Sequence, residues 1–208
     1  MDKLNPTVPA DPTINISSLI DVLNYFHPVS EEVKGYLREH IHACNFPKGK
    51  LILKAGQVCE HIYFIQKGAV RGFIKDGRKD VTTWITAENE LVSSISGFAD
   101  QEPALENMQT IEACEMLVMS FNDLQNLYEQ FPEFNIVSRK LLQHYYRDAE
   151  GRAFIARLSN AESKYKYFIS NNPHLVNRIP LKYVASFLGI TLETLSRVRR
   201  KILVSRSK

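Results

Sequence analysis

Residues 179–201 read IPLKYVASFLGITLETLSRVRRK, and this stretch predicts two short helices joined by a tight turn. Apolar residues recur at i, i+3, i+4 and i+7 in its first half, which is the spacing of one helix face. They are Leu181, Val184, Ala185 and Leu188. Gly189 follows at the position where helices often end in a left-handed residue. Thr191 can then cap a second helix, because its hydroxyl can accept a hydrogen bond from a backbone N–H of the first turn.

The second helix combines an apolar inner face with a polar, basic outer face. We expect four residues to face inward: Leu192, Leu195, Val198 and Ile202. We expect four to face outward: Glu193, Ser196, Arg197 and Arg200. Such a pattern is typical of a helix-turn-helix, whose second helix enters the major groove of DNA. The alternative is an ordinary helical hairpin with a solvated face, on which Glu193 and Arg197 form an i, i+4 ion pair.

The charge of the chain is unevenly spread. Residues 160–208 hold 10 Lys and Arg against 2 Asp and Glu, a balance of +8. The whole chain carries +3, which leaves −5 for residues 1–159. An acidic body with a basic C-terminal segment favours a nucleic-acid partner for that segment.

Length and composition indicate a folded protein of one or two domains. The 208 residues are 44% apolar, enough for a real core. The three cysteines are far apart and form no C-x-x-C pair, which argues against a zinc ribbon and a disulfide framework. The first residues have no apolar run typical of a signal peptide, and no stretch approaches the length of a membrane span. We therefore expect a cytoplasmic protein that does not enter membranes, with its thiols free.

Residues 1–44 predict a flexible lead-in and then two helices. Residues 1–15 contain three prolines and are expected to be flexible. Residues 16–44 are expected to form two helices. Ser18 and Asp21 resemble a capping box, and Ser30 resembles a second helix start.

Residues 46–120 have a β-rich texture punctuated by glycines. The expected strands are 51–54, 61–66, 69–74, 81–86, 108–113 and 115–120. Asp76 and Gly77 predict a two-residue hairpin turn. Many short strands with turn signals at this spacing indicate a sandwich or barrel.

Residues 133–158 predict one long helix with two adjoining apolar stripes. The first stripe is Phe134, Val137, Leu141 and Tyr145, and the second is Leu142, Tyr146, Ala149 and Ala153. Such a wide apolar surface favours a dimer helix, with the packed residues expected at Val137, Leu141, Tyr145 and Ala149. The alternative is a core helix packed wholly within its own chain.

A capping box at Ser159 and Glu162 starts a new helix, and the domain boundary is expected between Leu158 and Asn160. The predicted fold is α+β. Its expected parts are a flexible N-terminus (1–15), a β-roll sensor domain (16–122), linking and dimerisation helices (123–158) and a helix-turn-helix domain (159–208).

This order of elements resembles the Crp/Fnr family of bacterial transcription regulators. The resemblance rests on FPKGKLILKAG at 46–56, IYFIQKGAV at 62–70 and VASFLGITLETLSR at 184–197. It implies that the β-roll is a double-stranded β-helix like a cyclic-nucleotide-binding domain. It also implies a homodimer on double-stranded DNA, with half-sites about 34 Å apart, and RNA polymerase as a further partner.

The resemblance also assigns roles on the second helix. Glu193 and Arg197 match the family's base-reading acid and arginine, which suit cytosine N4 and the guanine O6/N7 acceptors. The remaining expected DNA contacts are Thr191, Thr194, Ser196, Arg199, Arg200 and Lys201. Leu192 departs from the arginine that the family often has there.

The nucleotide pocket is where the chain departs most from the family. Where relatives have Gly-Glu-Leu and Arg-Ser, this chain has Ser93, Ser94 and Ile95, and then residues 102–108. Residues 80–138 contain no Lys, Arg or His but eleven Asp and Glu. A buried phosphate needs a paired cation or a nest of backbone donors, so we expect no cyclic-AMP binding and no cofactor. The expected degenerate effector pocket comprises Ser93, Ser94, Ile95 and Met108, and the effector is uncharged, cationic or absent.

Other readings remain weaker. His40, His42 and Cys44 resemble metal ligands, but on a helix His42 would point away from the other two. We find no pairing of a nucleophile with a base, so no enzymatic activity is expected. The remaining alternative is a ligand-binding β-roll whose C-terminal helices bind a protein partner rather than DNA.

Overall fold

The computed structural model describes residues 14–206 of the chain; residues 1–13 of the predicted flexible N-terminus lie outside it. The helices are α1 (Ser17–Phe26), α2 (Glu31–His40), α3 (Ile95–Ala99), α4 (Phe121–Gln130), α5 (Phe134–Arg157), α6 (Ala161–Asn171), the 3-10 helix η1 (Pro173–Leu175), α7 (Leu181–Leu188) and α8 (Leu192–Arg206). The strands are β1 (His42–Phe46), β2 (Leu51–Leu53), β3 (His61–Lys67), β4 (Val70–Asp76), β5 (Lys79–Thr86), β6 (Leu91–Val92), β7 (Asn107–Thr110) and β8 (Cys114–Ser120).

The strands form a β-roll of two antiparallel sheets, which confirms the predicted α+β class. One sheet has the order β1-β8-β3-β6 and the other has the order β2-β7-β4-β5. A buried cluster between the sheets joins Phe46, Ile65, Val70, Val92, Cys114 and Met116. The hairpin predicted at Asp76 and Gly77 is present: Asp76 pairs with Lys79, and Gly77 has φ 58°.

The strand β1 was missed, because residues 16–44 were expected to be helical throughout. α2 ends at His40, and His42 and Cys44 lie on β1, so the helical geometry assumed for them was wrong. His40 instead stacks on Tyr36, with ring centroids 3.9 Å apart. Within residues 14–206, no group of three side chains is placed to hold a metal ion.

Two helix caps were predicted near the N-terminus, and one of them is right. Ser30 caps α2, and its hydroxyl accepts a hydrogen bond from Val33 N–H at 3.3 Å. Ser18 lies inside α1 and caps nothing. The Asn15 side chain accepts from Ser17 N–H at 2.9 Å instead.

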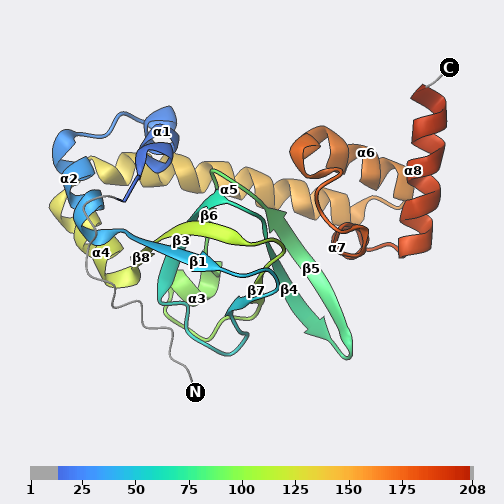
Figure 1. The fold of residues 1–208 in the computed structure, drawn as a ribbon, viewed down its shortest axis with the longest axis horizontal. Coiled ribbons are helices and arrows are strands. Elements are labelled where there is room, and N and C mark those ends of the chain that lie inside the picture. Colours follow the sequence, from blue (N-terminus) through green and yellow to red (C-terminus); the bar gives the residue numbers. More distant parts are fainter. Residues whose placement is uncertain (1–13, 207–208) are drawn as a thin grey trace.

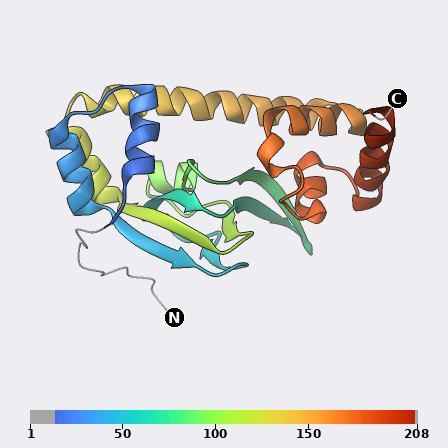
Figure 2. The same ribbon diagram turned by 45° about the horizontal axis from the view of Figure 1, so that its top comes forward.

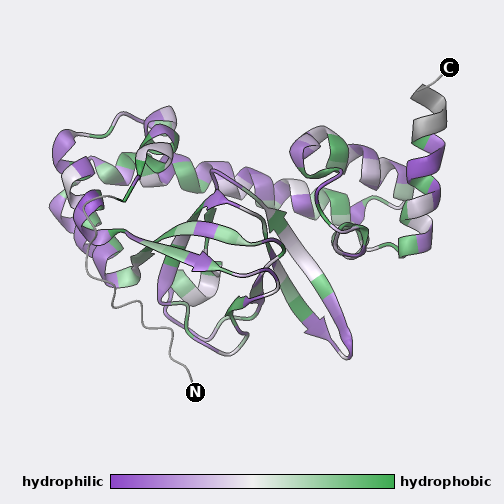
Figure 3. Cartoon of the chain, viewed as in Figure 1, coloured by the Kyte–Doolittle hydropathy of each residue, from purple (hydrophilic) through white to green (hydrophobic). Residues whose placement is uncertain are grey.

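α5 is the axis of the molecule (Figures 1 and 2). α1, α2 and α4 gather at one end of it, and α6, α7 and α8 at the other, with the β-roll alongside. Hydrophilic and hydrophobic residues alternate along α5, as expected for a helix packed on one face (Figure 3). Gly151 lets α5 approach α6, because an added Cβ would lie 2.8 Å from the Tyr167 hydroxyl.

We call residues 159–206 the head. It contains α6, η1, α7 and α8. The cap of α6 is Asn160 rather than Ser159: its side-chain oxygen accepts from Glu162 N–H at 2.8 Å and from Ser163 N–H at 3.3 Å. Lys164 is buried, and its ammonium donates to the Leu188 carbonyl at 2.9 Å, which satisfies the end of α7.

No helix within residues 14–206 is long and apolar enough to cross a membrane.

Candidate nucleic-acid interface and effector cleft

The predicted turn between α7 and α8 is formed by a left-handed glycine. Gly189 has φ 63° and ψ 39°. Its N–H donates to the Ser186 carbonyl at 3.1 Å, and Ile190 N–H donates to the Ala185 carbonyl at 3.0 Å. Thr191 Oγ1 then accepts from Thr194 N–H at 3.1 Å. The sequence prediction of a glycine turn followed by a threonine cap is confirmed.

α8 buries one face in the head and exposes the other. Leu195 is fully buried and Ile202 is 8% exposed. Leu192 was expected to face inward, but it is 44% exposed, so that prediction was wrong. It is the first residue of α8.

The expected DNA contacts divide into exposed and partly covered residues. The exposed ones are Thr191, Glu193, Ser196, Arg197, Arg200 and Lys201, and the half-buried ones are Thr194 and Arg199. The outer face predicted from the sequence is therefore the solvent face of α8.

The basic residues of α8 differ in their partners. Arg199 donates to Asn177 Oδ1 at 3.2 Å, and Lys201 lies 2.7 Å from Glu162 Oε2. Arg197 makes one contact within its own helix, to Thr194 Oγ1 at 3.3 Å. Arg199 and Lys201 therefore stabilise the head, whereas Arg197 and Arg200 extend from an exposed face.

Glu193 is held ionised at the start of α8. Its own backbone N–H, then the Thr191 hydroxyl, hydrogen-bond to the carboxylate and lower its pKa. An ionised carboxylate beside an exposed arginine offers both an acceptor and a donor on one surface.

A cleft of about 960 Å³ separates the β-roll from α5. Ser93 and Ile95, two of the residues predicted for the effector pocket, line it. Ser94 and Met108 are 2% and 0% exposed and do not line the cleft, so the structure does not bring them together with the other two at this surface. They belong to the packed interior of the β-roll.

The segment 102–108 contributes a carboxylate to this region rather than a cation. Glu106 accepts hydrogen bonds from Trp84 Nε1 at 3.0 Å and from the Thr83 hydroxyl at 2.9 Å. Gly72 makes room for the indole, because an added Cβ would lie 2.2 Å from the Trp84 ring. The side-chain donors of Trp84 and Thr83 are thus already occupied by an internal anion.

Two arginines do reach the cleft, from outside the stretch considered in the sequence. Arg147 and Arg152 of α5 both line it; Arg147 is exposed and Arg152 is half-buried. Burial lowers the pKa of Arg152, while Asp148 and Glu106 act in the opposite direction. The expectation of a pocket without a cation was therefore incomplete, because it considered only residues close in sequence; Arg152 is balanced by two carboxylates.

The residues predicted to form the dimer face lie mostly inside the chain. Val137 and Leu141 are 1% and 7% exposed and belong to the core shared with α1, α2 and α4. The Tyr145 hydroxyl accepts from Leu91 N–H at 2.9 Å. Ala149 is half-buried. Val137 and Leu141 are therefore not available to a partner, and assigning them to a dimer face was wrong; Tyr145 is half-buried, with its hydroxyl bound within the chain.

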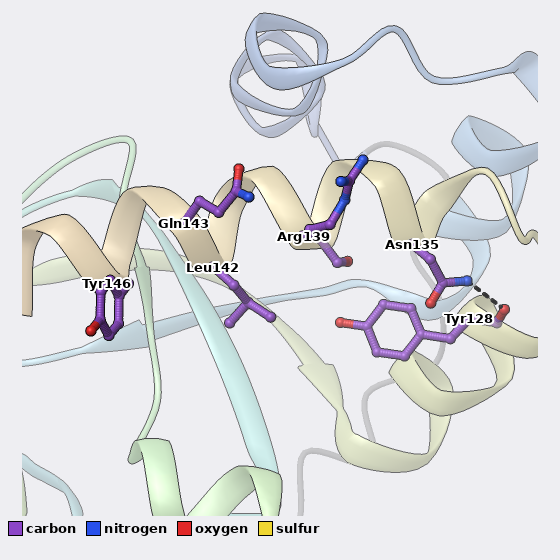
Figure 4. A pocket seen from close by; sticks show the side chains of 7 residues that line it. Tyr128, Asn135, Arg139, Leu142, Gln143 and Tyr146 are labelled. Carbon is purple, nitrogen blue, oxygen red and sulfur yellow. Dashed lines mark hydrogen bonds between the residues drawn. The ribbon is translucent and has the colours of Figure 1, made fainter.

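The second stripe on α5 is the exposed one. Leu142 and Tyr146 are 67% and 74% exposed. Figure 4 shows both side chains projecting from α5 on the side of Tyr128, where they line an open hollow between α4 and α5. Spacings of three and four residues continue this stripe through Ala149 and Ala153, which is the spacing of a coiled-coil seam.

The β-roll also matches a known domain family. Residues 43–131 match the family described as "Cyclic nucleotide-binding domain". The cAMP-activated global transcriptional regulator CRP of Salmonella typhimurium is 18% identical over 189 residues, covering 84% of this chain and 89% of CRP. The transcriptional activator protein anr of Pseudomonas aeruginosa is 23% identical over 163 residues, covering 73% of this chain and 66% of anr. The chain is therefore homologous to regulators of the Crp/Fnr family and carries a cyclic nucleotide-binding domain.

Solved structures of Crp/Fnr regulators share the fold. FixK2 from Bradyrhizobium japonicum has a TM-score of 0.67 at 17% identity, covering 79% of this chain and 85% of FixK2. A CooA mutant from Carboxydothermus hydrogenoformans has a TM-score of 0.65 at 15% identity, covering 93% of this chain and 88% of CooA. The named curated relatives are transcription regulators, which supports a regulator rather than an enzyme.

Proposed function

We propose that this protein is a cytoplasmic, sequence-specific DNA-binding transcription regulator that acts as a homodimer. The observation that carries the proposal is the solvent face of α8, where Glu193, Arg197 and Arg200 are exposed behind a well-formed glycine turn. A helix presented in this way fits the major groove, and its N-terminal residues reach base edges.

Each exposed residue has a chemistry that suits one part of the duplex. Arg197 can pair in a bidentate manner with guanine O6 and N7, and Glu193 can accept from cytosine N4. Thr191, Thr194 and Ser196 can contact phosphates or base edges through their hydroxyls. Arg200 adds attraction to phosphates that is independent of sequence, whereas Arg199 and Lys201 contribute through their charge while bound within the head.

We place the dimer contact on α5, through the exposed stripe of Leu142, Tyr146, Ala149 and Ala153. Small residues at the end nearer the head would let the two helices approach closely, and the pairing would set the spacing of two heads. The working division of the chain is a sensor over 16–122, linking and dimerisation helices over 123–158 and a DNA-binding domain over 159–208. RNA polymerase would be the further partner at a promoter.

We infer that the cleft is a degenerate nucleotide pocket whose effector, where one exists, is not a cyclic nucleotide. The Glu106 carboxylate occupies the donors of Trp84 and Thr83, and Arg152 is balanced by Asp148 and Glu106. The carboxylates of Glu90 and Asp148 also line the cleft together with Arg147 and Arg152, so an entering phosphate would have to compete with carboxylates for these cations. Titration calorimetry with cyclic AMP should show no binding, and micromolar binding would contradict this inference.

The decisive experiment is selection from random duplex DNA at two salt concentrations, followed by sequencing. We expect an enriched palindrome with half-sites about 34 Å apart. Replacing Arg197 with Ala should then cost about 1–3 kcal/mol on that site and relax its specificity. Replacing Arg200 with Ala is the matched control, since it should weaken binding evenly across sequences and reduce its salt dependence. Equal losses on specific and random DNA for both variants would contradict these roles.

The second candidate is a ligand-binding module whose head binds a protein. The exposed Leu192 favours it, because an apolar residue at the tip of α8 suits a protein surface. Weak binding that is blind to sequence at both salt concentrations would support this candidate.

A further inference from the structure

The head is packed against the β-roll as well as joined to it through α5. Ala69, Ala87 and Ile111 of the β-roll share one buried cluster with Phe168 and Val184 of the head. Three polar side chains of the head complete the contact: Arg178, Tyr183 and Ser186. We call these three residues and their β-roll partners the clamp.

Arg178 is the charged centre of the clamp. It lies between η1 and α7 and binds two carboxylates of the β-roll. Its guanidinium donates to Glu88 at 2.5 and 2.6 Å and to Glu112 at 2.7 Å. Gly68 N–H also donates to Glu88 Oε1 at 2.7 Å, so the β-roll backbone helps to hold this carboxylate in place. Forked, charge-assisted bonds of this kind define orientation as well as proximity.

Tyr183 covers a buried arginine of the β-roll. Arg71 is 3% exposed, and its guanidinium lies 4.1 Å from the ring centroid of Phe73 and 4.1 Å from that of Tyr183. Asp80 and Gln109 bind the edges of the same guanidinium at 2.8 Å. One face of the arginine is therefore closed by the head itself.

Ser186 continues the hydrogen bonding of a sheet. β5 is the outer strand of its sheet. The Ser186 hydroxyl accepts from Thr82 N–H at 2.9 Å and donates to the Asp80 carbonyl at 3.0 Å. A single side chain thus takes the place of a neighbouring strand along this part of β5.

We propose that the clamp fixes the direction in which α8 is presented to DNA, so that breaking it weakens specific DNA binding. All three clamp residues of the head lie on α7 or just before it, whereas α8 lies at the far end of the molecule (Figures 1 and 2). The clamp therefore holds the first helix of the motif and leaves the outer face of α8 free. The proposal rests on the proposed DNA-binding function.

The clamp also meets the cleft at one short turn. Residues 87–90 connect β5 to β6, and Asn89 there has a left-handed φ of 66°. Glu88 of this turn binds Arg178, and Glu90 lines the cleft beside Tyr145. A ligand that displaced Glu90 would act on Glu88 two residues away, so the turn links the cleft to the head.

The test replaces both β-roll carboxylates, Glu88→Gln with Glu112→Gln, in the full chain. This change removes two negative charges per chain, so electrostatics alone would strengthen binding to any duplex. Loss of the clamp predicts the opposite on the selected palindrome: affinity falls about tenfold or more while binding to random DNA does not fall. The matched control, Glu102→Gln with Glu115→Gln, makes the same charge change at exposed residues whose side chains do not touch the head.

A second readout does not depend on DNA. Hydrogen exchange at Thr82 N–H should accelerate in the clamp variant and in Ser186→Ala, which leaves the charge unchanged, but not in the control. The clamp proposal would be overturned if hydrogen exchange at Thr82 N–H were unchanged in these variants. It would also be overturned if the affinity of the clamp variant for the palindrome rose as much as that of the control. If the wild-type protein selects no duplex at all, the proposed function fails, and exchange at Thr82 still decides whether the clamp holds the head.

Discussion

At the scale of single residues, two glycines show how the space around the backbone decides whether a larger side chain is tolerated. Gly72 lies on β4 beneath the indole of Trp84, where an added Cβ would come within 2.2 Å of the ring. Gly35 lies within α2 and has nothing within 4 Å of the same atom. The two positions carry the same residue for opposite reasons, because only the first is required by a neighbour.

Gly72→Ala should destabilise the protein by about 1–3 kcal/mol, because the indole must move and its bond to Glu106 is strained. Trp84 is the one tryptophan of the chain, so its fluorescence reports the displacement directly. Gly35→Ala is the matched control and should stabilise α2 by about 0.5–1 kcal/mol. Urea unfolding of both variants measures the two effects, and a Gly72→Ala protein as stable as the wild type would contradict the packing described for Trp84.

Residue-scale prediction from the sequence succeeded where a signal was local. Gly189 and Thr191 carry turn and cap signals in their own side chains and their order. Arg178 was missed, since a lone arginine in a loop has no local feature that points to Glu88 and Glu112, which lie 90 and 66 residues away. Arg152 was missed for the same reason, because it lies far in sequence from the strands that form the other side of the cleft.

At the scale of elements, α5 illustrates what periodicity can and cannot determine. The pattern predicted the length of the helix and both of its apolar stripes. It could not say which stripe meets its own chain, because a helix presents the same spacing to either partner. The structure places Val137 and Leu141 in the core and leaves Leu142 and Tyr146 exposed.

Replacing Leu142 and Tyr146 together with Glu should therefore separate the proposed dimer without unfolding the chain. Two exposed apolar anchors of a seam contribute about 2–4 kcal/mol of association free energy, and glutamates facing each other add repulsion. Tyr25→Glu with Leu105→Glu is the control, because these residues are 84% and 79% exposed and are not part of the stripe on α5. Analytical ultracentrifugation should give a monomer for the first pair only. A dimer that survives both changes would move the interface off this stripe.

At the scale of the whole molecule, the succession of helical and β-rich regions could be predicted from local signals, whereas the β-roll arrangement followed from the family resemblance. β1, β6 and α3 were not predicted. The five residues of β1 follow a helix without a break in composition. The packing of the head on the β-roll was also beyond sequence reasoning. It depends on Ser186 and Tyr183, which on α7 alone look like ordinary surface residues.

Acid should loosen the head in a defined pH range. Hydrogen bonds from Arg178 lower the pKa of Glu88 to about 2, from an ordinary value of 4.5. Glu112 and the Cys114 thiol are the other titratable groups near Arg178 and Glu88. Because the folded-state pKa is depressed, the ion pair stabilises the protein fully above about pH 4.5, and this stabilisation is lost as the pH falls towards 2.

The difference in unfolding free energy between the wild type and Arg178→Met should therefore be about 1–3 kcal/mol at pH 7 and should shrink steadily below pH 4.5. Denaturant unfolding across this range measures the difference, and protonation of unrelated carboxylates cancels between the two proteins. A difference that stays constant down to pH 2.5 would mean that Glu88 does not supply the stabilisation.

The bonds made by Ser186 also bear on how the protein avoids aggregation. An uncovered outer strand offers its free N–H and carbonyl groups to strands of other molecules, which leads to domain swapping and fibres. Here the Thr82 N–H and the Asp80 carbonyl are closed by one hydroxyl from the head. A β-roll separated from its head would therefore expose β5 as an edge strand that can pair with strands of other molecules. In the intact protein the folded head covers this part of the edge.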